Sequence, residues 1–197
     1  MLLVVDNGSI YTEHLIDFLS KQKAEYETRT VGETLVRDLA EASTEKYLQR
    51  FDSFILTGRK ENNRIMNKVN SEIIKHAISE KNSLLGICYG AEILNQTQGG
   101  TIRPHNSRVL GEETVVVEKK NEICHDKISV FESHRWEISQ LGKELHCLAS
   151  SKSCKYEIIK HAISEKNSLL GICYGAEILN QTQGGTIRPH NLSLIHI

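Results

Sequence analysis

The chain lacks long hydrophobic runs, blocks of basic residues and paired Cys-x-x-Cys motifs. No apolar stretch approaches the roughly 20 residues that a membrane-spanning helix requires, so we expect no association with a membrane. The formal net charge is -1 and the basic residues are dispersed, which argues against nucleic acid as a partner. A length of 197 residues, 39% of them hydrophobic, is enough for one globular domain with a sizeable core.

The amino terminus lacks the basic start and the small-residue cleavage site of a signal peptide, and residues 1–6 read instead as a strand. We therefore expect a cytoplasmic protein. The cysteines are irregularly spaced and do not form the pairs typical of zinc ligands, so we expect no metal site. In a reducing compartment these five residues are expected to be free thiols: Cys88, Cys124, Cys147, Cys154 and Cys173.

The segment Gly86-Ile87-Cys88-Tyr89-Gly90 follows a short apolar run and precedes a helical pattern. Small residues on both sides of a nucleophile are typical of a nucleophile elbow, a strained turn from a strand into a helix. The positive end of the helix dipole would lower the pKa of the Cys88 thiol. The alternative is a buried strand cysteine beside a chance pair of glycines.

An internal repeat is the most unusual feature of the sequence, because residues 72–106 and 157–191 are identical. Natural structural repeats diverge at their surface positions. We interpret residues 157–191 as an artefactual copy that begins at the shared EIIKH, and residues 192–197 as a non-native tail. A truncated domain would then occupy residues 1–160. A recent tandem duplication in the gene is the alternative.

Strands and helices alternate along the first hundred residues, which predicts an α/β fold with a doubly wound, mainly parallel sheet flanked by helices. Ligands bind such sheets outside the carboxyl ends of the strands, where Asp6, Gly58 and Cys88 are expected to lie. The copy of the elbow strand, at residues 169–173, has no evident place in this sheet. Short β-like runs further along predict a small antiparallel extension, at residues 113–118, 128–131, 136–138, 145–149 and 154–159.

Four segments resemble the class I glutamine amidotransferases, and among them the glutaminase subunits of archaeal-type GMP synthases. The resemblance covers residues 1–160 and implies a flavodoxin-like sheet. It is carried by the elbow, by Gly99-Gly100-Thr101, by Glu132-Ser133-His134 and by the segment 153–157 (SCKYE).

The resemblance implies hydrolysis of the glutamine side-chain amide through a thioester on Cys88. The ammonia would pass to a synthetase partner, an ATP pyrophosphatase subunit in GMP synthesis. ATP and magnesium are expected only on that partner, so this domain would need no cofactor. The oxyanion donors would be the backbone N–H groups of Tyr89 and of the Gly58-Arg59 loop. Further residues are expected to bind the substrate: Gly86, Gly90, Glu92, Ser133 and His134.

Three departures from the family pattern bear on activity. Arg59 replaces a second glycine of the oxyanion loop, and a non-glycine residue resists a positive φ. Glu92 replaces a common glutamine, and its carboxylate would oppose ionisation of the thiol. The family's late His-Pro-x-Glu motif is absent, since Pro104 and Pro189 both follow arginine. The catalytic His and Glu are therefore not present, and we expect this chain to lack turnover.

Two other functions stay open from the sequence. The first is a different cysteine hydrolase on a similar sheet, acting on peptide or γ-glutamyl bonds. The second is a non-catalytic binding protein that keeps the fold.

Overall fold

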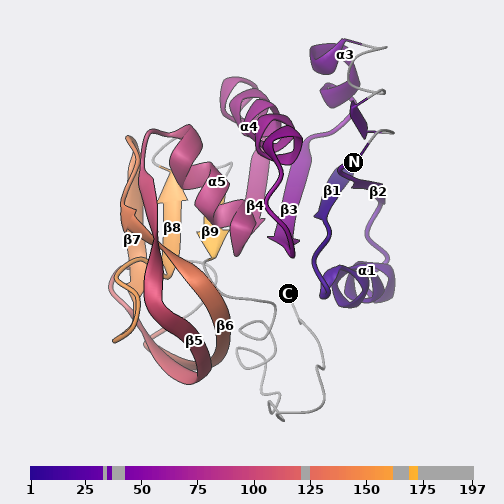
Figure 1. Ribbon diagram of the computed structural model, residues 1–197. Helices are drawn as coiled ribbons and strands as arrows, with labels where there is room; N and C mark the ends of the chain where they lie inside the picture. The colour runs from indigo at the N-terminus through magenta and orange to yellow at the C-terminus, as the bar shows by residue number, and fades with distance from the viewer. Residues whose placement is uncertain (33–34, 37–42, 121–124, 162–168, 173–197) are drawn as a thin grey trace.

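The computed structural model describes residues 1–32, 35–36, 43–120, 125–161 and 169–172 (Figure 1). The predicted tail 192–197 lies outside these residues, as does Cys173. The described strands belong to one sheet. They are β1 (Leu2–Asn7), β2 (Tyr26–Thr30), β3 (Ser53–Arg59), β4 (Ser83–Ile87), β5 (Thr101–Val117), β6 (Lys127–Gln140), β7 (Leu145–Ser150), β8 (Ile158–His161) and β9 (Leu169–Ile172).

The strand order across the sheet is β2-β1-β3-β4-β9-β8-β7-β5-β6. The first five of these strands run parallel to one another, and β8, β7, β5 and β6 pair antiparallel with their neighbours. The predicted α/β fold, with its mainly parallel sheet and antiparallel extension, is therefore confirmed. In Figure 1 the parallel strands lie at one end of the sheet and the β5–β6 hairpin curls away at the other.

Helices cover both faces of the parallel strands because apolar side chains point alternately to the two sides of β1. Leu3 and Val5 pack in one core with α4 and α5, whereas Val4 packs on the other side against α1. In the described part of the chain no helix combines the length and apolarity needed to cross a membrane. The helices are α1 (Thr12–Lys21), α3 (Thr44–Leu48), α4 (Arg64–Ser79) and α5 (Tyr89–Thr97).

The antiparallel extension is larger than the sequence indicates, because β5 has 17 residues and β6 has 14. Most side chains of β5 are exposed or half-buried, so the strand lacks the alternating apolar pattern that would reveal its length. The pairing with β6 shifts register between Pro104 and Val109. This irregular stretch carries side chains of two clusters described below.

The copied segment does have a place in the sheet, so the expectation that it has none is wrong. Strand β9 pairs with its own twin β4 in parallel, Leu84 opposite Leu169 through to Ile87 opposite Ile172. On its other side β9 pairs antiparallel with β8. The copy therefore extends the parallel sheet by one strand and joins it to the antiparallel extension.

The pentapeptide EIIKH has a different secondary structure in each copy. Ile73 and Ile74 lie in helix α4, whereas Ile158 and Ile159 lie in strand β8, and all four side chains are fully buried. In α4 the two isoleucines pack against the parallel strands, and in β8 they contact opposite sides of a central strand. Tertiary packing therefore overrides local propensity in this segment.

Candidate functional site

The turn between β4 and α5 has the strained geometry predicted for a nucleophile elbow. Cys88 is the N-cap of α5 and has φ 52° and ψ -107°, a conformation that costs free energy for a residue with a Cβ. Its backbone N–H donates a 2.7 Å hydrogen bond to the carbonyl oxygen of Ile172 in β9. The neighbouring strand thus helps to hold the turn.

The two glycines of the elbow are required by close backbone contacts. A Cβ on Gly86 would lie 2.5 Å from the carbonyl carbon and oxygen of Gly90. A Cβ on Gly90 would collide with the carbonyl oxygen of Leu56 in β3. The motif therefore fixes how closely helix α5 approaches the sheet, which is a role that only glycine fills.

A cleft of about 260 Å³ opens in front of Cys88 at the carboxyl ends of the parallel strands. This volume suits a ligand the size of an amino acid, since drug-sized ligands occupy roughly 300–1,000 Å³. Gly58 lies close to the thiol, because a Cβ on it would be 3.6 Å from the Cys88 Cβ. The lining comprises Ser9, Ile10, Tyr11, Thr12, Leu15, Thr57, Gly58, Arg59, Lys60, Ile87, Cys88, Arg108 and Ser133.

The structure brings only part of the predicted binding set to this cleft. Ser133 lines it, whereas Glu92 and His134 are buried outside its lining. Gly86 and Gly90 hold the elbow from behind. Their roles in substrate binding stay predictions, as do those of the backbone donors at Tyr89, Gly58 and Arg59.

Asp6 lies at the predicted edge of the sheet but outside the cleft lining. Its carboxylate accepts hydrogen bonds from the Thr12 hydroxyl, at 2.7 Å, and from the Gly8 N–H, at 2.9 Å. The carboxylate thus organises the turn between β1 and α1. That turn presents several lining residues to the cleft.

Arg108 is the lining residue with the weakest signal in the sequence, since it belongs to no motif. It lies in the irregular part of β5, and its Nη2 donates a 2.7 Å hydrogen bond to the Ser133 hydroxyl. The long β5–β6 hairpin brings these two side chains from distant positions to the same wall of the cleft. Ser9 and Tyr11, from the β1–α1 turn, also carried no motif.

Two of the departures from the family pattern form a single interaction. The guanidinium of Arg59 lies 3.7 Å from the Glu92 carboxylate and stacks on the Tyr89 ring, 4.1 Å from its centroid. Arg59 also donates hydrogen bonds to Asn62 and Asn67. It is not among the described residues with positive φ, so its side chain imposes no strain there.

Burial makes the Glu92 carboxylate hard to ionise and raises its pKa, an effect that Arg59 partly offsets. The side chain is 9% exposed, so Glu92 is not a surface residue of helix α5. The arginine and the glutamate thus satisfy one another behind the elbow.

The pKa of the Cys88 thiol is raised to about 12, contrary to the lowering expected from the helix dipole. Burial is the largest cause and the charge of Glu92 the next, whereas the Tyr89 N–H and Arg59 act in the opposite direction. In the described part of the chain, the charges that act on the thiol do not come from a histidine. The thiol is therefore protonated at neutral pH, and the elbow holds a nucleophile without its base.

The comparisons with known proteins agree with this geometry. The family model described as glutamine amidotransferase class-I matches residues 3–162. One of the two GMP synthase (glutamine-hydrolyzing) chains of the comparison, a separate subunit from Methanocaldococcus jannaschii, is 22% identical over 190 residues, which cover 95% of this chain and 93% of that protein.

Two further similarities differ in extent. GMP synthase (glutamine-hydrolyzing) of Wigglesworthia glossinidia brevipalpis is 21% identical over 196 residues, but this chain spans only 35% of its length. The crystal structure of a glutamine amidotransferase from Thermotoga maritima superposes with a TM-score of 0.71 at 14% identity, covering 92% of this chain and 78% of that one, which is a similarity of fold. From the extent of the family match, we conclude that the chain belongs to the class I glutamine amidotransferase family.

Proposed function

We propose that the cleft in front of Cys88 binds glutamine, and that this domain is the glutaminase part of an ammonia-transferring system. The observation that carries the proposal is the strained elbow that presents Cys88 to a cleft of amino-acid size. A thiolate at this position would attack the side-chain amide carbon and form a thioester with release of ammonia. The N–H groups of Tyr89 and of the Gly58-Arg59 loop would stabilise the oxyanion.

Arg108 is the group proposed to recognise the α-carboxylate of glutamine. Its guanidinium lines the cleft and is held by the Ser133 hydroxyl, so one N–H edge is already oriented. Arginine presents several donors in a planar fork that matches a carboxylate. The wall formed by Arg108 and Ser133 would therefore fix the amino-acid end of the substrate, while its amide faces Cys88.

The ammonia acceptor is proposed to be an ATP pyrophosphatase subunit that makes GMP. The support is the similarity to separate GMP synthase subunits over nearly the whole chain. Turnover needs a base and an acid that orients it, and this chain has no His-Pro-x-Glu motif to supply them. We therefore propose that this chain binds glutamine without completing hydrolysis.

Replacement of Arg108 by alanine is expected to weaken glutamine binding, measured by equilibrium dialysis with radiolabelled glutamine. Loss of a hydrogen bond to a charged group costs about 1.5–3 kcal/mol, so the Kd should rise by roughly 10- to 150-fold. The matched control is Arg135→Ala, which removes an exposed arginine of β6 from outside the cleft lining and should leave the Kd unchanged. In the same samples, ammonia release should not exceed that of a Cys88→Ala variant. The proposal fails if glutamine does not bind or if both arginine variants bind it equally.

A further inference from the structure

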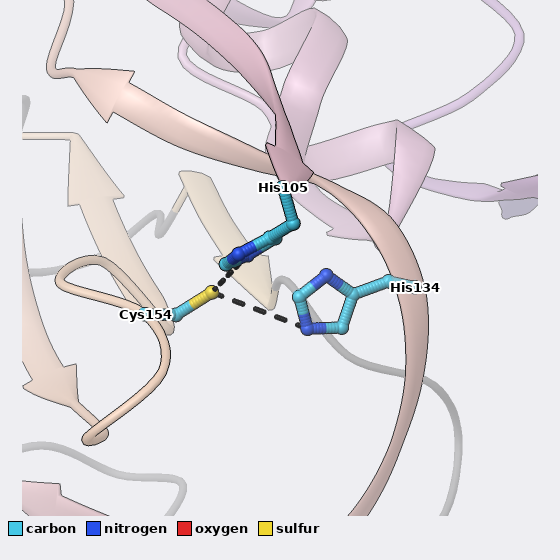
Figure 2. A group of neighbouring side chains, drawn as sticks. All are labelled: His105, His134 and Cys154. Atoms are coloured by element: carbon cyan, nitrogen blue, oxygen red, sulfur yellow. Dashed lines mark hydrogen bonds between the residues drawn. The ribbon is translucent and has the colours of Figure 1, made fainter. Parts of the chain in front are cut away.

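Three side chains with metal-binding atoms converge beside the β5–β6 hairpin, away from the cleft lining. Figure 2 shows the Cys154 sulfur pointing at the rings of His105 and His134. The Sγ atom lies 3.4 Å from His105 Nε2 and 4.0 Å from His134 Nε2, and the three atoms all lie within 4.8 Å of one another. Each residue thus offers its best ligand atom to one point.

These side chains come from three separate segments that the fold brings together. His105 lies in β5, His134 in β6 and Cys154 in the loop between β7 and β8. Cys154 is 2% exposed, and the side chains of His134 and His105 are 3% and 14% exposed. A site made this way is pre-formed and shielded, yet accessible from the His105 side.

The spacing of the three atoms fits a tetrahedral zinc ion. With Zn–S bonds of about 2.3 Å and Zn–N bonds of about 2.0–2.1 Å, neighbouring sulfur and nitrogen ligands lie about 3.5 Å apart. The observed sulfur–nitrogen distances of 3.4 and 4.0 Å bracket this value. Small rotations of the side chains would complete the geometry.

The hydrogen bonds of His134 leave its Nε2 directed at another acceptor. Its Nδ1 lies 2.8 Å from the Trp136 carbonyl oxygen, which can only accept, so Nδ1 carries a proton. Nε2 of the neutral ring then has a lone pair, yet it lies 3.1 Å from the Glu132 carboxylate. A cation between or beside them removes this conflict. A backbone carbonyl on the second ring nitrogen is also the usual partner of a metal-binding histidine.

Buried negative charge around the group provides a second, independent observation. The Glu132 side chain is fully buried, and its Oε1 atom has no hydrogen-bond partner in the described part of the chain. Glu137 lies on the other side, with one carboxylate oxygen 3.7 Å from His105 Nε2. Buried carboxylates normally carry a compensating charge, so this pocket is incomplete without a cation.

We propose that His105, His134 and Cys154 bind one Zn²⁺ ion, with the fourth position flanked by the carboxylates of Glu132 and Glu137. The nitrogen and sulfur donor set is the one that zinc prefers. Binding would release the thiol proton to solvent, so that the ligand is the thiolate. The expectation of no metal site rested on cysteine spacing, and it is revised by a site whose ligands have no local sequence pattern.

The ion would fasten the β5–β6 hairpin to the β7–β8 loop. Ser133 lies between Glu132 and His134, and strand alternation directs it to the cleft while its neighbours face the proposed site. The metal would therefore fix the cleft wall formed by Arg108 and Ser133 without contacting a ligand in the cleft. This role is structural and does not depend on what the cleft binds.

Cobalt substitution tests the proposal with a signature that a merely structural role for these residues would not produce. Purified chain, stripped with a chelator and titrated with Co²⁺, should develop visible ligand-field bands and a thiolate-to-cobalt absorption at one ion per chain. Zinc should displace the cobalt, and mass spectrometry of metals should find one zinc per chain. Cys154→Ser and His105→Asn should weaken zinc binding by more than the roughly 10–100-fold that loss of an outer-shell partner causes.

Matched controls keep the test decisive. Cys147→Ser removes a cysteine of β7 whose sulfur donates to backbone carbonyls, and His146→Asn removes an exposed histidine next to it. Both should bind zinc like the parent chain, and circular dichroism should show that each variant is folded. The proposal is overturned if the folded parent binds no zinc, or if the thiolate absorption persists in Cys154→Ser.

Discussion

Alkylation of Cys88 by iodoacetamide is expected to be very slow at neutral pH and to accelerate about tenfold for each pH unit between about pH 7 and 10. Only the thiolate reacts, and a pKa raised to about 12 keeps its fraction small and proportional to hydroxide across this range. The measurement is the rate of modification of the peptide that contains Cys88, by mass spectrometry of quenched samples. A rate that levels off near pH 8–9, the range of an ordinary cysteine, would contradict the assignment.

The same experiment separates the causes of this shift. Glu92→Gln removes the carboxylate that opposes ionisation, so the pKa should fall and alkylation should be faster at any fixed pH. Glu72→Gln is the matched control, because its side chain is 43% exposed on helix α4 and should leave the rate unchanged. Equal rates in the two variants would show that burial alone controls the thiol.

Replacement of Gly90 by alanine is expected to destabilise the protein at the upper end of the about 1–3 kcal/mol that overpacking costs. In an ordinary helix this change gains up to about 1 kcal/mol of helix propensity. Here the added Cβ would meet the carbonyl oxygen of Leu56, a backbone atom of a central strand that cannot turn aside. The clash should therefore win, and urea denaturation followed by circular dichroism would measure the loss.

Other glycines provide the comparison for this prediction. Gly32→Ala places a Cβ in open space and should change the free energy of unfolding by no more than about 0.5 kcal/mol. Gly86 and Gly171 have the same sequence neighbours, but a Cβ on Gly86 meets backbone, whereas one on Gly171 lies 2.7 Å from a side-chain atom of Ile159. Gly86→Ala should therefore cost more than Gly171→Ala. Equal stability of Gly90→Ala and Gly32→Ala would contradict the role assigned to the elbow glycines.

The parallel half of the fold could be predicted because its signals are local. Apolar runs such as residues 2–5 and 84–87 are long enough to identify buried strands, and glycines around Cys88 mark a turn whose conformation the structure confirms. The amphipathic pattern of α4 identified a helix from the spacing of its buried residues. In these segments sequence pattern and tertiary packing favour the same structure.

The antiparallel half could not be predicted to the same extent because its order depends on distant partners. The register of β5 is set by β6 and not by any apolar alternation of its own. The helix or strand state of EIIKH is decided by which side of the sheet it packs against. The letters around Ile73 and Ile158 are identical, so local sequence has no basis for separating them.

The candidate site shows the same division. Cys88 is visible as a motif, but the pairing of Arg59 with Glu92 is visible only once β3 and α5 are side by side. Arg108 and the group containing His134 and Cys154 are likewise products of the fold. Isolated polar residues in such stretches look like surface positions until their neighbours are known.

Covalent labelling with a glutamine analogue tests the central claim most directly, namely that Cys88 lies in a glutamine-binding cleft. A chloromethyl ketone in place of the side-chain amide should modify Cys88 at alkaline pH, glutamine should protect it, and Cys88→Ala should remain unlabelled. Trypsin spares the Arg-Pro bonds, so residues 82–108 and 167–197 give peptides of different mass and distinguish Cys88 from its copy. Protected labelling of the 82–108 peptide is the predicted result. Labelling that glutamine does not slow, or that persists at the same extent in Cys88→Ala, would contradict the account.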